Sequence, residues 1–144
     1  LLTIRILEAG LKVLQSVSEC ILQPQSDLDK VRQFLHQHGF QIVQEKMLID
    51  EGKYYVVMRV LHGEERIYTE AEDIYGRFLI NEKHPVLKEY LEKQKAVKEK
   101  LLLALKDKTS EKSHERQQEL LHELQIINET ITRMVDENAE QRPD

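Results

Sequence analysis

Cysteine and glycine are scarce in this sequence of 144 residues, which contains one cysteine and five glycines. A single cysteine excludes an internal disulfide bond. The glycines form neither of the common phosphate-binding motifs, so no nucleotide phosphate site of those kinds is expected. Long apolar runs are also missing, because runs such as residues 101–105 are far too short to cross a bilayer. No segment resembles a signal peptide, and we therefore expect a cytoplasmic protein without a membrane partner.

The remaining composition indicates one modest domain. Hydrophobic residues make up 40% of the chain, enough for one core but not for several large domains. The lone Cys20 lies in an apolar run, which predicts a buried, unreactive thiol. The histidines lack metal-ligand spacing, because even His36 and His38 are two apart and point to different faces of a helix. We expect no metal site, and no nucleophile stands in a recognisable catalytic context.

Charge is unevenly distributed along the chain. The net charge of −5 argues against a general cationic surface for nucleic acid. Residues 88–112 nevertheless carry a net charge of +3, whereas residues 113–144 carry −5. We expect two helices of opposite charge that pair along their flanks.

The first part of the chain has the pattern of an α/β unit. Residues 2–14 show helical spacing of apolar side chains, and residues 18–22 form a short apolar run that Pro24 ends. We interpret this run as a buried, parallel strand. A second helical stripe starts at Leu28, and Gly39 can close that helix. Because the helical pattern begins at once and without a cap, we expect a chain cut from a longer protein.

Two extended runs follow. Residues 40–49 and 53–60 are joined across residues 50–52, whose glycine allows the positive φ of a hairpin turn. The second run is apolar on both faces, which predicts a central strand covered on both sides. The first run carries Glu45 and Lys46 and resembles an edge strand protected by charge.

The last part of the chain predicts an antiparallel pair of helices. Residues 61–84 are the least periodic, and we interpret them as a connector. A proline at position 85 can stand in the first turn of a helix, and residues 107–114 are polar and short enough for the turn. The apolar stripe expected on the first helix comprises Leu87, Tyr90, Leu91, Val97, Leu101 and Ala104. The seam expected on the second, with coiled-coil spacing, comprises Leu120, Leu124, Ile127, Ile131 and Met134.

One loop is a candidate for chemistry. Gln23, Pro24 and Gln25 follow the carboxyl end of the first strand, the place where ligands gather in open α/β sheets. A glutamine amide both donates and accepts hydrogen bonds, which suits the edge of a nucleobase. The alternative is structural, with Pro24 ending the strand, Ser26 capping the helix and both glutamines solvated.

Lysines of the first long helix are candidates for RNA contact. Lys88 and Lys95 recur at seven residues, so they should share an outward face, and Lys98 follows within one turn. The alternative is a solvated helix face whose lysines pair with glutamates. No aromatic residues are interleaved with these lysines, so the pattern alone does not specify RNA.

Five segments in this order resemble the TrmK family, bacterial tRNA adenine-N1 methyltransferases that depend on S-adenosylmethionine. The segments are Ile21-Leu22-Gln23-Pro24, Val31-Arg32-Gln33-Phe34-Leu35-His36-Gln37-His38-Gly39-Phe40, Asp50-Glu51-Gly52-Lys53-Tyr54-Tyr55, Tyr75-Gly76 and Glu82-Lys83-His84-Pro85. The resemblance covers almost the whole chain. It implies a Rossmann-like class I methyltransferase sheet of which the chain holds the last three strands, with the strand at 54–60 inserted between the other two.

The resemblance also implies a division of labour. Residues 1–62 would be the carboxyl-terminal part of the methyltransferase domain, 63–84 a connector and 85–144 a coiled-coil hairpin that helps to bind tRNA. The cofactor-binding strands would be absent, so this chain alone should bind no S-adenosylmethionine and be inactive. The alternative is a non-catalytic coiled-coil module that binds a protein partner. In either case the hairpin offers a surface for homo-oligomers.

Overall fold

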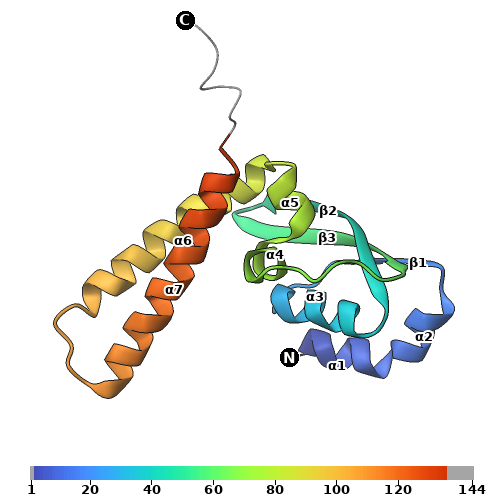
Figure 1. Cartoon of the computed structure of the whole chain (residues 1–144), viewed down its shortest axis with the longest axis horizontal. Coiled ribbons are helices and arrows are strands. Elements are labelled where there is room, and N and C mark those ends of the chain that lie inside the picture. Colours follow the sequence, from blue (N-terminus) through green and yellow to red (C-terminus); the bar gives the residue numbers. More distant parts are fainter. Residues whose placement is uncertain (1, 136–144) are drawn as a thin grey trace, which may run out of the picture.

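The computed structural model describes residues 2–135 and contains two regions, an α/β body and a pair of long helices (Figure 1). The elements are α1 (Leu2–Ala9), α2 (Leu11–Ser16), β1 (Glu19–Leu22), α3 (Leu28–Gln37), β2 (Phe40–Asp50), β3 (Lys53–His62), α4 (Glu70–Tyr75), α5 (Arg77–Asn81), α6 (Pro85–Ala104) and α7 (Glu111–Arg133). Within the described residues, no helix is both long and apolar enough to cross a membrane. The predicted division into three parts at residues 62 and 84 stays a prediction.

The sheet has three strands in the order β1-β3-β2, so β3 is central as predicted. Both pairs are antiparallel. The expectation that β1 is a parallel strand is therefore wrong among the described strands, because its one neighbour, β3, runs in the opposite direction. The β2–β3 turn has positive φ at Glu51 (50°) and Gly52 (79°), which confirms the predicted tight hairpin.

Within residues 2–135, helices cover only one face of the sheet. On β3, Val56, Met58 and Val60 are buried in the common core, whereas Val57 is half-buried and Arg59 is exposed. The predicted burial of both faces is wrong, because the described helices pack against the face that carries Val56 and Met58. Apolar side chains on both sides of a strand do not reveal which side is covered in a given chain.

The edge strand β2 contains a β-bulge and a buried glutamate. Its pairing with β3 shifts between Ile42 and Gln44, which leaves one extra residue in β2 as a β-bulge. Glu45, predicted to be a solvated edge charge, is fully buried. Lys46 is exposed, so the charged-edge prediction holds for the lysine and fails for the glutamate.

Helix α3 forms at the residues for which the apolar stripe predicted a helix. Asp27 holds its N-cap position with a left-handed φ of 53°, although its side chain makes no capping hydrogen bond. Gly39 follows the helix with φ of 79°, as expected for a C-terminal glycine. The first helical stripe is split at Gly10 into α1 and α2, and Leu7 is its buried member while Ile6 is 63% exposed.

The predicted connector contains two short helices. Thr69 and Glu72 form a capping box at the start of α4, in which the Thr69 side chain accepts from the Glu72 amide and the Glu72 carboxylate accepts from the Thr69 amide. Gly76 has φ of 94° and separates α4 from α5. The predicted connector thus contains helical structure at residues 70–75 and 77–81, although its sequence is the least periodic of the chain.

Helices α6 and α7 lie side by side and run away from the sheet (Figure 1). Their turn starts at residue 105 and ends before Glu111, a few residues earlier than predicted. Four predicted seam residues of α7 are buried, namely Leu120, Leu124, Ile127 and Met134. On α6, Leu87 and Leu91 are buried, but Val97 and Leu101 are 53% and 45% exposed, so the predicted stripe is wrong beyond Leu91. Coiled-coil geometry and self-association through this hairpin stay predictions.

Candidate functional site

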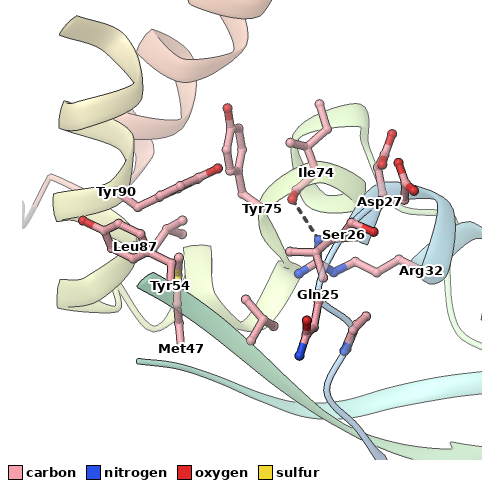
Figure 2. Close-up of a pocket in the computed structure, with 14 residues that line it drawn as sticks. Gln25, Ser26, Asp27, Arg32, Met47, Tyr54, Ile74, Tyr75, Leu87 and Tyr90 are labelled. Carbon is pink, nitrogen blue, oxygen red and sulfur yellow. Dashed lines mark hydrogen bonds between the residues drawn. The ribbon is translucent and has the colours of Figure 1, made fainter. Parts of the chain in front are cut away.

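A cavity of about 430 Å³ lies where the loop after β1 meets β2, β3, α3, α4 and α6 (Figure 2). It is lined by Pro24, Gln25, Ser26, Asp27, Leu28, Asp29, Arg32, Met47, Tyr54, Val56, Ile74, Tyr75, Leu87 and Tyr90. Its volume is within the range of small-molecule sites, and its walls combine apolar and polar groups as such sites do. The cavity joins the loop after β1 to the base of the helical hairpin.

The loop singled out from the sequence lies at this cavity. Pro24 and Gln25 line it, and both also line an adjoining cavity of about 450 Å³. Gln23 lines the adjoining cavity and is not among the lining residues of the first. In Figure 2 the amide of Gln25 points away from Tyr75 and Tyr90. A hydrogen-bonding role of Gln23, Pro24 or Gln25 toward a base stays a prediction.

Three tyrosines form the aromatic wall of the cavity of about 430 Å³. Tyr54 comes from β3, Tyr75 from the end of α4 and Tyr90 from α6. The rings of Tyr54 and Tyr90 meet edge to face with centroids 4.9 Å apart. Burial raises the pKa of Tyr75 and of Tyr90, so both hydroxyls stay protonated at neutral pH and act as hydrogen-bonding groups, not as bases.

Sequence reasoning did not select these tyrosines. Tyr90 was placed on an apolar helical stripe, and Tyr54 on a strand face. Nothing in the spacing links positions 54, 75 and 90, because they reach the cavity from three separate elements. The available signal was the pair Tyr75-Gly76, since an aromatic residue before a glycine with positive φ is held at a turn.

A buried ion pair supports the wall behind Tyr75. The Arg32 guanidinium donates from Nε to Glu45 Oε1 at 3.0 Å and from Nη1 to the carbonyl oxygens of Asp73 and Ile74, at 2.6 and 2.9 Å. Both charged side chains have no exposed surface. Figure 2 shows the hydrogen bond from Arg32 to the carbonyl oxygen of Ile74, the residue that precedes Tyr75 in the sequence. The pair therefore ties α3, β2 and α4 together at the edge of the cavity.

Gly76 allows this close approach. A Cβ at Gly76 would overlap Glu45 Oε2 and lie 3.0 Å from Arg32 Nη2, while its φ of 94° already disfavours other residues. Burial raises the pKa of the Glu45 carboxyl more than the neighbouring guanidinium lowers it. Arg32 and Glu45 are thus enclosed so tightly that no side chain at position 76 would fit beside them.

The lysines predicted to contact RNA differ in surroundings. Lys88 is exposed, whereas Lys95 is half-buried. Lys98 is 19% exposed and its Nζ lies 2.9 Å from Glu123 Oε2 on α7, which confirms the expected pairing of opposite charges across the hairpin. Lys93 lies nearer to the cavity, with its Nζ 5.5 Å from the centroid of the Tyr54 ring and 3.1 Å from Glu89.

Neither a metal site nor a cofactor loop is found in the described part of the chain. No group of three or more histidine, cysteine or acidic residues could hold a metal ion there. Its four glycines with positive φ do not combine a strand, a glycine-rich turn and a helix. The expectation that this chain alone does not bind S-adenosylmethionine stays a prediction.

The chain is similar to bacterial methyltransferases. The family model for TrmK, tRNA (adenine(22)-N(1))-methyltransferase, matches residues 1–129. The Streptococcus pneumoniae protein Sp1610, a candidate tRNA methyltransferase solved with S-adenosyl-L-methionine, is 34% identical with a TM-score of 0.76. The match covers 90% of this chain and 55% of that protein. No curated protein matches the sequence.

Two further structures share the fold. A Streptococcus agalactiae protein of the NADB-Rossmann superfamily is 28% identical, with a TM-score of 0.78 over 90% of this chain and 55% of that one. Bacillus subtilis TrmK is 24% identical, with a TM-score of 0.78 over 88% of this chain and 57% of that one, and this likeness concerns the fold alone. The chain thus spans slightly more than half the length of these solved proteins. By its match over residues 1–129, the chain belongs to the TrmK family of S-adenosylmethionine-dependent tRNA (adenine(22)-N(1))-methyltransferases.

Proposed function

We propose that this chain is the carboxyl-terminal portion of a cytoplasmic tRNA (adenine-N1) methyltransferase and provides its tRNA-facing side. The matched region covers only 55% of the length of a solved relative that contains S-adenosyl-L-methionine. In this proposal the cofactor is held mainly by a portion outside this chain. The chain alone is then inactive, and the work of its own residues is to bind tRNA and to receive the target base.

The observation that carries the proposal is the position of the tyrosine-lined cavity. It opens beside the loop after β1, at the sheet edge where Rossmann-like proteins gather ligands. Its opposite wall is Tyr90 on α6, the first helix of the hairpin. A base that has left its stack can rest against tyrosine rings there, while the hairpin contacts the surrounding RNA.

The hairpin lysines provide the electrostatic part of the proposal. Lys88 is free to approach phosphates because it is exposed, and Lys95 lies seven residues further along the same helix. Lys98 is engaged with Glu123, so its contribution to RNA binding requires exchange of that partner. Each phosphate contact releases counterions and makes binding depend on salt.

The experiment measures binding of the chain to a tRNA transcript with adenine at position 22, by fluorescence anisotropy at several salt concentrations. Replacing Lys88 and Lys95 together with glutamate should weaken binding and reduce the salt slope by about one unit per lost contact. The matched control replaces the exposed Lys12 and Lys30, which lie outside the hairpin, and makes the same change in net charge.

The two lysine pairs separate the possible functions. A loss of affinity confined to the hairpin pair supports tRNA docking. Equal losses from both pairs, or no tRNA binding at all, would contradict it and favour the coiled-coil interaction module. A parallel assay with S-adenosylmethionine and tRNA should yield no methylated product from the chain alone, and measurable turnover would overturn the division of the site.

A further inference from the structure

Asp29 is the charged residue of the cavity for which the fold provides no partner. It lies in the first turn of α3 and lines both the tyrosine cavity and a neighbouring cavity of about 250 Å³. The two cavities meet at Tyr75 and Tyr90, which line both. Among the described residues, Asp29 has no hydrogen bond or ion pair from its carboxylate.

The cations that line the same cavities are already neutralised. Arg32 is paired with Glu45 at 3.0 Å, and Lys98 is paired with Glu123 at 2.9 Å. No cationic side chain of the described residues is paired with the carboxylate of Asp29, which therefore places a negative charge beside the tyrosine rings. A partly enclosed site with this charge favours a cationic ligand over a neutral one of the same shape.

The aromatic wall has the same preference. The negative faces of aromatic rings attract cations, and cages of aromatic side chains recognise methylated cations for this reason. Tyr54, Tyr75 and Tyr90 supply three such rings, and the edge-to-face contact of Tyr54 with Tyr90 leaves them at different inclinations. Lys93 already lies near the Tyr54 ring, at 5.5 Å from its centroid.

We propose that Asp29 and the three tyrosines make the cavity selective for the cationic base N1-methyladenine over adenine. This inference rests on the proposed function, in which adenine is the base that enters. An adenine alkylated at N1 carries a positive charge at neutral pH, because its exocyclic nitrogen keeps its proton. The site would thus hold the methylated product more tightly than the substrate, and Asp29 would be the residue that distinguishes them.

The same charges set the orientation of the nucleotide. Asp29 repels a phosphate from the interior, so the phosphate should remain at the mouth of the cavity. Lys93 is 56% exposed, lies 5.5 Å from the ring centroid of Tyr54, and can exchange its contact with Glu89 for a phosphate oxygen. The base enters toward Asp29 while the phosphate faces the hairpin.

The test measures binding of nucleotides to the complete 144-residue chain by calorimetry at pH 7. The probes are adenosine 5′-monophosphate, its N1-methyl derivative and 1-methylinosine 5′-monophosphate, which carries the methyl group without the charge. The N1-methyl adenine nucleotide should bind about tenfold more tightly than the other two. Asp29→Asn should abolish this preference, whereas Asp29→Glu should retain most of it.

The controls distinguish this inference from the proposed function. Asp107→Asn, at an exposed position beyond the end of α6, should leave the preference unchanged, and circular dichroism should show that each variant is folded. Equal binding of the three nucleotides, no binding of any, or a preference that survives Asp29→Asn would overturn the inference. Because tRNA binding is measured separately, nucleotide selectivity without tRNA binding would instead contradict the proposed function alone.

Discussion

Replacing Glu45 with glutamine should be among the most damaging isosteric changes in this chain. The substitution keeps the shape of the side chain and removes its charge, so the Arg32 guanidinium remains buried without a counterion. Arg32 cannot withdraw to solvent, because Nη1 is held by the carbonyl oxygens of Asp73 and Ile74 at 2.6 and 2.9 Å. Removing one partner of a buried pair typically costs about 3–5 kcal/mol.

Urea unfolding, followed by circular dichroism, measures this cost. With a slope of about 2 kcal/mol per molar urea, a loss of 3–5 kcal/mol lowers the unfolding midpoint by about 1.5–2.5 M. Glu64→Gln is the matched control, since Glu64 is exposed, and should change the free energy of unfolding by less than about 0.5 kcal/mol. A loss below about 1 kcal/mol for Glu45→Gln would refute the idea that this charge pair is held rigidly.

A double replacement separates the pair from its surroundings. Arg32→Met with Glu45→Met removes both charges and should recover part of the loss, because desolvation of the carboxylate no longer has to be offset. Recovery should be incomplete, since the carbonyl groups of Asp73 and Ile74 lose their donor at about 1 kcal/mol each. A double variant as unstable as the sum of the single ones would show that Arg32 and Glu45 act independently.

Three further changes test other parts of the fold. Gly76→Ala should destabilise the chain by about 2–4 kcal/mol in urea unfolding, because strain at positive φ adds to a clash with the buried carboxylate, whereas Gly39→Ala, with nothing near its Cβ, should cost only about 1 kcal/mol. Leu124→Asp should cost several kcal/mol and lower the melting temperature, while Val97→Asp on the exposed side of α6 should not, and equal effects would mean a wrong seam. A hydrogen bond from Arg66 lowers the pKa of Glu72 from 4.5 to about 2. The ionised Glu72 should therefore contribute its full share to the free energy of unfolding above pH 4.5, and this share should be lost as the pH falls through 2. Glu72→Gln should remove this pH dependence.

Local features of this fold were predictable because they depend on neighbouring residues. Gly39 and Gly52 have the positive φ that their turns require, and the residues between Asp50 and Lys53 form the tight turn of a hairpin. The central position of β3 followed from its apolar content, although its second face is open. The α4 helix was also accessible, since Thr69 and Glu72 have capping-box spacing, but the irregular apolar pattern around them concealed it.

Features that depend on distant residues were not predictable. Glutamate on a strand indicates solvent, and only the approach of Arg32 from α3 makes burial of Glu45 tolerable. On α6 the lysines alternate with two apolar stripes of similar spacing, so Val97 was assigned to the wrong side. The tyrosine wall likewise has no local signature, because separate segments supply its rings.

The composition of the cavity wall has a thermodynamic consequence. Its lining residues extend from Pro24 to Tyr90, so the cavity exists only when α3, the sheet and the start of the hairpin are folded together. A ligand that binds there binds the native state and not the unfolded chain. At a free concentration one hundred times its dissociation constant, such a ligand adds about 2.7 kcal/mol to the free energy of unfolding. Occupancy of the cavity should therefore slow hydrogen exchange in β3 and at the base of α6 together, although more than twenty residues separate them in sequence.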